Sequence, residues 1–315
     1  MKVSLVIPVY NEEENLPILF QSIQKEMQAL KTTWEVIFVD DGSRDNSQAV
    51  LGELAKKEPN HVRVVIFRRN FGQTAAIAAG IDHSQGETIV LLDADMQNDP
   101  ADIPMLLAKL DEGYDLVSGW RKDRKDNRFT RTIPSNLANG LISWVTGVHL
   151  HDYGCTLKAY RRAALEGFRL YGEMHRFIPV FAYSIGAKIT ELPVRHHPRK
   201  FGVAKYGLER TVKVVLDLFT VKFLLDYSHK PMRLFGGAGT ILMLIGAVDL
   251  LYLFIRRFFG IPASTSPLLM IGVMLVIMGF QAVLMGLIAE LLARTYHESQ
   301  SKPTYTVRAI LGKKK

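Results

Sequence analysis

The sequence predicts an α/β domain with a mostly parallel β-sheet, followed by a pair of membrane-spanning helices. One observation is that short apolar segments alternate with helical segments through residues 3–119, which is typical of βαβ units. Another is that residues 234–254 and 268–292 are almost wholly apolar, and each run has the roughly 20 residues that a membrane-spanning helix needs. A third is a pair of aspartates, Asp93 and Asp95, at the end of a predicted strand.

Five strands are predicted from short runs of apolar, mostly β-branched residues. The run at residues 88–92 is continuously apolar, which fits a strand buried on both faces of a parallel sheet. Helical segments separate the runs, so successive strands are expected to be parallel. The expected strands are residues 3–9, 34–39, 62–67, 88–92 and 115–119.

Helix signals stand between these strands. Asp99 and Pro100 supply a capping side chain and a first-turn proline for the fourth helix. Residues 12–14 (EEE) place acidic groups in the first turn of the first helix, where the helix dipole favours them. Residues 45–47 (DNS) supply a cap for the second helix. The expected helices are residues 12–30, 45–57, 72–80 and 101–112.

The two apolar runs are joined by a short turn and are expected to form a transmembrane hairpin. Basic residues are concentrated on the outer flanks, and this bias places both ends of the hairpin and the large N-terminal domain in the cytoplasm. The protein is therefore expected to be a multi-pass protein of the cytoplasmic (inner) membrane. The flanking basic residues are Lys222, Lys230, Arg233, Arg294, Lys302, Arg308 and residues 313–315, whereas the turn carries Arg256 and Arg257.

Small and polar residues in the hairpin have predictable positions. Asp249, Gln281 and Glu290 are expected to face a helix partner, another subunit or a lipid headgroup rather than lipid tails. Glycines allow close helix approach, which is compatible with a homo-oligomer formed through the transmembrane helices. These glycines are Gly236, Gly237, Gly239, Gly272, Gly279 and Gly286.

Composition limits the class of protein. The chain has 315 residues, a formal net charge of +8 and one cysteine, Cys155, so it cannot form an intrachain disulfide. The positive charge suits nucleic acid, an anionic membrane or a phosphorylated substrate. Nucleic-acid binding would explain neither the apolar runs nor the aspartate pair, so no nucleic-acid partner is expected. The first apolar run ends at Pro8 and is too short for a secretory signal.

The aspartate pair predicts a metal site. Asp93 and Asp95 follow a central strand, and open α/β sheets bind ligands at the carboxyl ends of their strands. Two carboxylates and the amide oxygen of Gln97 are hard donors that suit Mg²⁺ or Mn²⁺ bridging a diphosphate. The competing interpretation is that these aspartates only stabilise a turn. The chain has no G-x-G-x-x-G after its first strand and no P-loop lysine motif, which disfavours dinucleotide redox chemistry and NTP hydrolysis.

Three motifs stand in order at predicted strand ends: residues 6–12 (VIPVYNE), 39–45 (VDDGSRD) and 93–95 (DAD). Together they resemble the signature of family 2 glycosyltransferases with the GT-A fold. Four further segments resemble the polyprenyl-phosphate branch of that family, which includes dolichyl-phosphate mannose synthases, bactoprenol glucosyltransferases and the aminoarabinose transferase of lipid A modification. These segments are residues 69–73 (RNFGQ), 97–100 (QNDP), 152–155 (DYGC) and 201–206 (FGVAKY). The resemblance covers nearly the whole chain.

The resemblance implies a nucleotide-sugar site at these strand ends. It assigns the divalent ion, Mg²⁺ or Mn²⁺, to Asp93, Asp95 and Gln97. Simpler interpretations exist, because Glu12 suits a helix cap and residues 40–43 suit a turn. The residues implied to bind the donor are Pro8, Tyr10, Glu12, Asp40, Asp41, Gln73, Asp93 and Arg121.

The resemblance also implies a site for the acceptor lipid phosphate, formed by Arg131, Ser135 and Lys205. Arginine suits bidentate phosphate contact. Residues 206–227 show an apolar stripe with interspersed lysines, which fits either a helix lying in the membrane interface or a helix packed on the core. Most other basic residues are expected to be solvated surface charges.

The residues implied to be catalytic are Asp95, Asp152 and Arg131. A phosphate monoester oxygen is already anionic near neutral pH, so it needs little help from a general base. Asp152 is therefore expected to orient the sugar or to accept a proton. Irregular spacing and loop positions favour ordinary surface or cap roles for the histidines, which are His149, His151, His175, His196 and His197.

The predicted activity is the inverting, metal-dependent transfer of one sugar to a polyprenyl phosphate. The resemblance to bactoprenol glucosyltransferases favours UDP-glucose as the donor and undecaprenyl phosphate as the acceptor. GDP-mannose, UDP-N-acetylhexosamine and UDP-aminoarabinose remain alternative donors. A processive polysaccharide synthase would need a Q-x-x-R-W motif and more spans, and a non-catalytic scaffold would not need an intact Asp93-x-Asp95 pair. The expected organisation is a cytoplasmic GT-A catalytic domain (1–205), juxtamembrane amphipathic helices (206–232), two transmembrane helices (233–293) and a basic cytoplasmic tail (294–315).

Overall fold

A computed structural model describes residues 2–122, 133–165, 170, 174–198, 217–218, 221–222, 231–260, 267–299 and 307–311. The chain forms two compact units. The first contains Met1–Val221 together with Pro303–Lys315, and the second contains Lys222–Lys302. The end of the chain therefore belongs to the same unit as its beginning.

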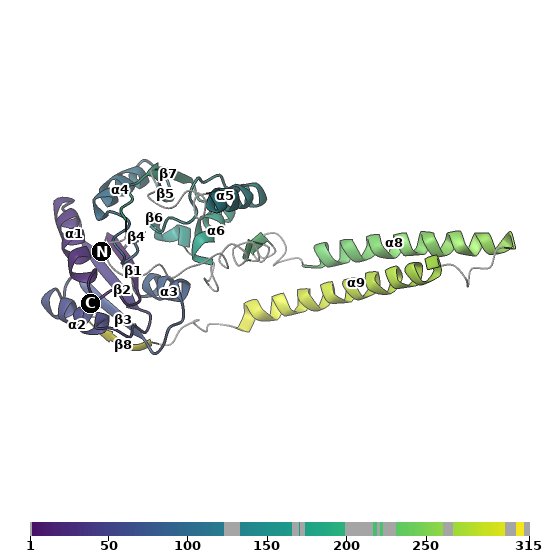
Figure 1. The fold of residues 1–315 in the computed structure, drawn as a ribbon, viewed down its shortest axis with the longest axis horizontal. Coiled ribbons are helices and arrows are strands. Elements are labelled where there is room, and N and C mark those ends of the chain that lie inside the picture. Colours follow the sequence, from purple (N-terminus) through teal and green to yellow (C-terminus); the bar gives the residue numbers. More distant parts are fainter. Residues whose placement is uncertain are drawn as a thin grey trace. The chain divides into compact units, whose positions relative to one another are not determined.

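The first unit is built on an eight-stranded sheet of order β7-β5-β6-β4-β1-β2-β3-β8 (Figure 1). Strand β1 is parallel to both β2 and β4, β2 is parallel to β3, and β5 is parallel to β7. Strand β6 is antiparallel to β4 and β5, and β8 is antiparallel to β3. The prediction of a mostly parallel, mixed sheet is confirmed. The strands are β1 (Val3–Val9), β2 (Trp34–Asp40), β3 (Val62–Phe67), β4 (Thr88–Leu91), β5 (Leu116–Trp120), β6 (Lys158–Arg161), β7 (Ile189–Pro193) and β8 (Val307–Leu311).

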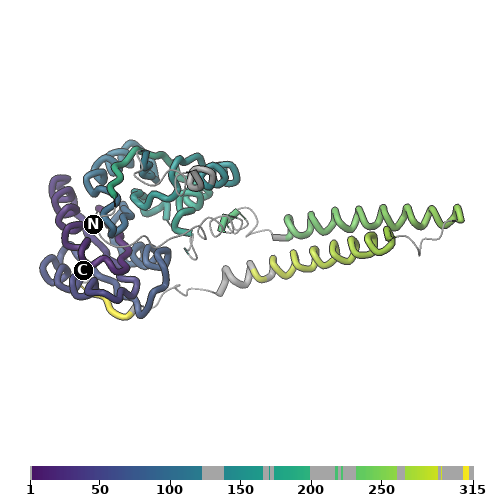
Figure 2. The backbone as a smooth tube through the Cα atoms, viewed as in Figure 1, coloured from purple at the N-terminus to yellow at the C-terminus, as the bar shows by residue number. Residues whose placement is uncertain are grey.

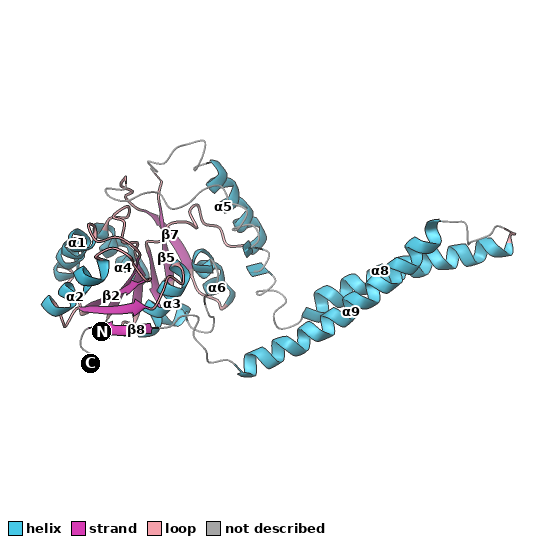
Figure 3. Ribbon diagram, turned by 60° about the horizontal axis from the view of Figure 1, so that its bottom comes forward, coloured by secondary structure: helices cyan, strands magenta, loops and turns pink. Residues whose placement is uncertain are grey.

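Helices cover both faces of this sheet (Figure 3). Helices α1, α2 and α4 lie on one face, and α3 and α6 lie on the other. Successive residues of β1 alternate between the faces, since Leu5 joins the core formed with α1 whereas Val6 meets Gly80 of α3. A Cβ atom at Gly80 would lie 2.2 Å from Cγ1 of Val6, so α3 packs directly on the strand. The helices are α1 (Leu16–Ala29), α2 (Ser47–Lys57), α3 (Gln73–His83), α4 (Ile103–Asp111), α5 (Ile133–Thr146) and α6 (Ile178–Ser184), with short 3₁₀ turns η1 (Pro100–Asp102), η3 (Arg162–Leu165) and η4 (Met174–Phe177).

Local sequence signals predicted the position of most of these elements, but the predicted start of the first helix was wrong. Helix α1 begins at Leu16, and its first turn contains no acidic residue. The backbone amides of Glu12 and Glu13 instead donate to Ser47 and Asp45, which ties this segment to the loop before α2. The predicted cap at Asp99 is confirmed, because its carboxylate accepts the amide hydrogen of Ala101 at 3.0 Å.

Strand β8 was not predicted, and it completes the sheet. Residues of the C-terminal tail lie along β3, with Val64 opposite Leu311 and Phe67 opposite Val307. Figure 2 shows this yellow segment beside the blue strands of the N-terminal part of the chain. Ala309 and Leu311 pack against the core, so the strand adds apolar contacts as well as backbone hydrogen bonds. It covers what would otherwise be an open sheet edge.

The second unit is a hairpin of α8 (Pro231–Phe258) and α9 (Pro267–Ser299). Both helices are long and apolar enough to cross a membrane, and only 17% and 11% of their most apolar windows are buried. A core helix of a soluble protein would be mostly buried, so the exposed apolar surface favours lipid as its surroundings.

Glycines bring the two helices of the hairpin into backbone contact. A Cβ atom at Gly239 would lie 2.5 Å from the carbonyl oxygen of Gly279, and one at Gly246 would lie 2.7 Å from that of Gly272. The paired positions run in opposite directions, so the helices are antiparallel. This confirms close helix approach, and it shows that these glycines are used inside the hairpin. Self-association through the same helices stays a prediction.

Candidate active site

The parallel strands β1, β2, β3 and β4 end at one edge of the sheet, and the sequence motifs lie in the loops that follow them. Pro8 is in β1, and Tyr10 and Glu12 follow that strand; all three are partly exposed. The Glu12 carboxylate accepts a hydrogen bond from the side chain of Asn15 at 2.7 Å. The three residues that were assigned to the base and ribose thus lie in one segment at this edge.

The loops after β2 and β3 are locked together. Both Asp41 oxygens accept backbone amides, from Phe71 at 2.6 Å and from Gly72 at 3.0 Å. Gly42 has a φ of +70°, and a Cβ atom there would lie 2.6 Å from the backbone carbon of Arg69. Only glycine combines this backbone angle with so close an approach. Burial raises the pKa of Asp41 to about 6.

Asp40 also stabilises a turn. Its carboxylate accepts the amide of Ser43 at 3.3 Å and the side-chain amide of Gln48 at 2.8 Å. Burial raises the pKa of this carboxyl group. The geometry thus shows the loop-stabilising role for both Asp40 and Asp41, and contact of either with a nucleotide base stays a prediction.

Asp93 and Asp95 follow β4 in a tight turn. Asp95 is 8% exposed and accepts the backbone amide of Gln97 at 3.1 Å, and Met96, which follows Asp95, has a φ of +60°. Gln73, at the start of α3, donates to Asp93 at 2.8 Å. Burial and the negative charge of Asp95 raise the pKa of Asp93 to about 6. Two carboxylates that repel each other in this way are the environment that a divalent cation relieves.

The donor set fits a hard divalent ion such as Mg²⁺ or Mn²⁺. Within the described ranges, no group of three or more His, Cys, Asp and Glu side chains could hold a metal ion by itself. The aspartate pair would therefore need further ligands, from the amide of Gln97, from water or from substrate oxygens. That requirement suits an ion that binds together with a diphosphate.

Arg121 and Asp152 form a buried ion pair that sequence reasoning did not predict. The guanidinium donates from Nε to Oδ2 at 2.7 Å and from Nη2 to Oδ1 at 3.0 Å. The side chains are 13% and 3% exposed. The amide of Gly154 donates to Asp152 as well, at 3.0 Å. Because donors already occupy both oxygens of Asp152, the arrangement favours an orienting role over proton transfer.

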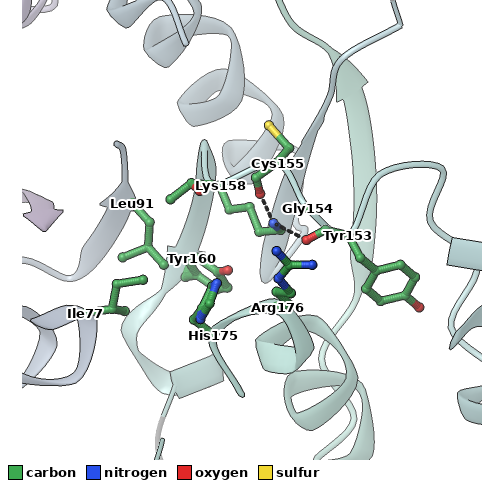
Figure 4. Close-up of a pocket in the computed structure, with 10 residues that line it drawn as sticks. Ile77, Leu91, Tyr153, Gly154, Cys155, Lys158, Tyr160, His175 and Arg176 are labelled. Carbon is green, nitrogen blue, oxygen red and sulfur yellow. Dashed lines mark hydrogen bonds between the residues drawn. The ribbon is translucent and has the colours of Figure 1, made fainter. Parts of the chain in front are cut away.

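Behind these carboxylates lies a pocket between β4, β6, α3 and η4 (Figure 4). Thr156 bonds to Asp93, and Lys158 donates to the backbone carbonyls of Cys155 and Tyr153. His175 is 9% exposed and lies 2.8 Å from the hydroxyl of Thr74. The pocket is lined by Ile77, Leu91, Tyr153, Gly154, Cys155, Thr156, Lys158, Tyr160, His175 and Arg176.

The predicted surface role of the histidines is wrong for two of them. His175 and His196 are buried, at 9% and 8% exposure. Their positions depend on contacts with residues distant in the sequence, Thr74 for His175 and a backbone bridge to Asn98 for His196. His151 is 66% exposed and pairs with Glu191. His149 is exposed, as expected, and His197 bonds to Asp99 at 3.1 Å.

The acceptor side of the predicted site is only partly described. Arg131 and Lys205 lie outside the described residues, and Ser135 belongs to α5 in a part whose side chains are not described. The basic residue Arg195 donates to Asp102 and forms an ion pair with Asp99, which gives it a structural role. The assignment of the lipid phosphate to Arg131, Ser135 and Lys205 stays a prediction.

Solved structures share this fold. Glucosyl-3-phosphoglycerate synthase from Mycobacterium tuberculosis, in complex with Mn²⁺ and UDP-glucose, superposes with a TM-score of 0.52 over 70% of this chain and 78% of that one, at 18% identity. The complex of the same enzyme with Mn²⁺, UDP and phosphoglyceric acid gives 0.52 over 71% and 78%, also at 18% identity. At this level of identity the comparison shows the GT-A fold alone.

Curated relatives match along nearly the full length. A dodecaprenyl-phosphate galacturonate synthase of Rhizobium johnstonii is 43% identical over 98% of this chain and 93% of the relative. An undecaprenyl-phosphate 4-deoxy-4-formamido-L-arabinose transferase of Proteus mirabilis is 38% identical over 100% and 95%. The family model "Glycosyl transferase family 2" matches residues 4–168, more than half of the chain. With its GT-A sheet and its aspartate pair at the carboxyl edge, the chain belongs to glycosyl transferase family 2 and is a glycosyltransferase.

Proposed function

We propose that this glycosyltransferase transfers a single sugar from a nucleotide donor to a polyprenyl phosphate at the membrane. The observation that carries the proposal is that one chain combines the Asp93–Asp95 pair at the sheet edge with a hairpin of two membrane-length apolar helices. A lipid acceptor requires the second feature, and a nucleotide-sugar donor suits the first. The names of the full-length relatives support the same acceptor class.

The relatives' names indicate the class of the donor sugar. UDP-glucose leads by motif resemblance, but the relatives' names do not mention glucose. The aminoarabinose alternative agrees with relatives that are 38% identical, and a galacturonate synthase is 43% identical. We therefore propose a UDP-linked sugar of the uronate or modified-pentose type, and keep UDP-glucose, GDP-mannose and UDP-N-acetylhexosamine in the donor panel.

The reaction forms a bond between an oxygen of the acceptor phosphate and the anomeric carbon of the sugar. The bond from that carbon to the nucleoside diphosphate breaks, and the diphosphate leaves with its electron pair. A divalent cation bound by Asp93, Asp95 and Gln97 would neutralise the charge on this leaving group. Gln73 fixes the rotamer of Asp93, and Arg121 holds Asp152 in place. Inversion at the anomeric carbon is what the family resemblance implies.

We further propose that the catalytic unit and both termini face the cytoplasm. The outer flanks of the hairpin carry most of the nearby lysines and arginines, and this bias sets topology in short loops. The strand β8 supports this placement, because it puts the C-terminal residues in the same unit as the N-terminal sheet. A cysteine-accessibility assay on intact cells would test it, using labels placed among residues 261–266, between the two helices, and in the C-terminal tail.

The direct test of function is transfer of radiolabelled sugar from the donor panel to undecaprenyl phosphate by the purified full chain. Lipid-extractable product should form with Mg²⁺ or Mn²⁺, disappear with EDTA, and be absent in Asp95→Ala. Lys188→Ala, far from the motif loops in the sequence, is the matched control and should retain activity. Lack of lipid-linked product from every donor, in protein that still binds UDP, would refute the proposal and favour a non-catalytic scaffold.

A further inference from the structure

The pocket behind the aspartate pair contains buried hydrogen-bond donors that the proposed chemistry does not use. Among the described residues, neither the hydroxyl of Tyr160 nor Nε of Arg176 has a hydrogen-bond partner. Tyr160 is 0% exposed. Leaving buried polar groups unsatisfied destabilises a protein, so such groups point to a ligand. Figure 4 shows both groups directed toward the space next to Lys158 and His175.

The charge of the lining selects the class of ligand. The described lining residues include Lys158, His175 and Arg176 but no aspartate or glutamate. Lys158 already binds the carbonyl oxygens of Cys155 and Tyr153, so these two acceptors are occupied. Burial lowers the pKa of Lys158, whereas arginine stays protonated, which makes Arg176 the permanent positive charge. The lining suits an anion that accepts hydrogen bonds.

The pocket shares two walls with the reaction site. Thr156 lines it and bonds to Asp93, next to the predicted metal. Gly154 also lines it, and a Cβ atom there would lie 3.2 Å from Nη2 of Arg121 and 3.4 Å from Oδ1 of Asp152. The space enclosed between these side chains is small, about 10 Å³ for a water-sized group, so at most one small substituent of a sugar enters it and a whole nucleotide sugar does not. A group bound here would belong to the sugar beside the diphosphate.

We propose that this pocket recognises a carboxylate on the donor sugar, so that the preferred donor is a nucleotide-linked uronic acid. Arg176 Nε and the Tyr160 hydroxyl would each donate to the carboxylate, and Lys158 and His175 would stabilise its charge. This inference rests on the proposed function and deepens it, because it assigns the specificity of the same site. A neutral hydroxymethyl group in the same place leaves the arginine without a counter-charge.

The test compares matched donors that differ only at this substituent. Purified full-length protein, undecaprenyl phosphate and Mn²⁺ are assayed with UDP-galacturonate against UDP-galactose, and with UDP-glucuronate against UDP-glucose. At least one uronate should exceed its neutral partner in kcat/KM by about 100-fold or more. Equal or higher kcat/KM for both neutral donors overturns the inference while leaving the proposed function standing. No lipid-linked product from any donor overturns both.

Two variants assign the preference to the pocket. Arg176→Gln and Tyr160→Phe should each reduce the uronate-to-neutral ratio by about 10-fold or more, the effect of losing a hydrogen bond to a charged group. Tyr160→Phe removes a single oxygen and keeps the ring, so it preserves the test if Arg176→Gln does not fold. Arg161→Gln is the matched control. Arg161 lies in β6 next to Tyr160, but its side chain bonds to Leu110 and Asp111, so this variant should keep the parent's uronate-to-neutral ratio.

The variants also separate the sugar carboxylate from the other anion nearby. If the pocket binds the acceptor phosphate, both variants raise KM for undecaprenyl phosphate and leave the donor ratio as it is, which overturns the inference. An equal loss of activity with charged and neutral donors indicates a structural role and overturns it as well. A lower ratio at constant acceptor KM supports it.

Discussion

The ion pair between Arg121 and Asp152 permits a quantitative test of how the site is held together. The perturbation is a double-mutant cycle with Asp152→Ala, Arg121→Met and the double variant. Asp152→Ala leaves a guanidinium that is only 13% exposed without its carboxylate, and Arg121→Met leaves a carboxylate that is 3% exposed without its cation. Removing one partner of such a buried pair costs about 3–5 kcal/mol. The partial exposure of Arg121 favours the lower end, about 3 kcal/mol.

The double variant should cost less than the sum of the two single variants. It removes both charges together, and a buried pair contributes little net stability relative to apolar replacements. For a domain of this size, about 3 kcal/mol corresponds to a decrease in Tm of roughly 6–12 °C. Each single variant should therefore melt in that range below the parent, with a coupling energy of at least about 1.5 kcal/mol between the two sites.

Intrinsic fluorescence of the full chain in detergent is a suitable assay, because the three tryptophans, Trp34, Trp120 and Trp144, all belong to the first unit. Glu53→Ala is the control, since Glu53 and Lys56 form an ion pair that is 61% and 76% exposed, and it should not shift Tm measurably. Two single variants that melt within 2 °C of the parent, or a double variant whose loss equals the sum, would refute the reasoning.

Three further predictions concern the loops and the sheet edge. The pKa of Asp93 is raised to about 6 from 3.8, so ionisation of this carboxyl destabilises the metal-free fold by up to about 3 kcal/mol as pH rises from 4 through 6. Asp95→Asn should reduce this pH-dependent loss of stability, measured by thermal melts with chelator. An unchanged dependence of Tm on pH would contradict the prediction. Gly42→Ala should lose about 1–3 kcal/mol and weaken UDP binding in calorimetric titrations, because the new methyl meets the backbone of Arg69, whereas Gly52→Ala, where nothing lies within 4 Å, should be neutral or stabilising. Deleting residues 307–315 should expose the β3 edge and increase aggregation measured by light scattering; a monodisperse truncated protein of equal Tm would disprove the capping role.

Local sequence signals were sufficient for the first half of the sheet. Strands β1 and β3 have the predicted bounds, β2 and β4 differ by one residue at one end, and β5 is shifted by one residue at both ends, because continuous apolar runs between helices determine buried parallel strands. Strand β6 was missed because its sequence, KAYR, has neither alternation nor an apolar run. Its lysine, Lys158, is buried, and its ammonium group donates hydrogen bonds to the carbonyls of Tyr153 and Cys155. No local sequence pattern indicates these bonds.

The same distinction applies to the site. Asp93 and Asp95 were predictable because a strand end determines where they lie. The contacts of Arg121 with Asp152 and of Thr74 with His175 join residues that are 31 and 101 positions apart. Such pairs depend on the order of strands in the sheet, which spacing alone does not give. Because Thr74 is 101 positions from His175, the sequence near His175 gives no sign of this partner and predicts a surface residue, although the side chain is buried in the fold.

The pairing of β8 with β3 has a consequence for how the protein is made. The ribosome releases residues 307–311 only after both apolar helices have been synthesised, yet these residues form the last strand of a sheet that begins at Val3. The nascent catalytic unit therefore keeps an unpaired β3 edge while the hairpin enters the membrane. If the hairpin spans the membrane, β8 can pair with β3 only when both ends of the hairpin lie on the same side, so completion of the sheet depends on that arrangement. A chain inserted in the wrong orientation would leave an open edge, a form that quality-control proteases and chaperones are able to recognise.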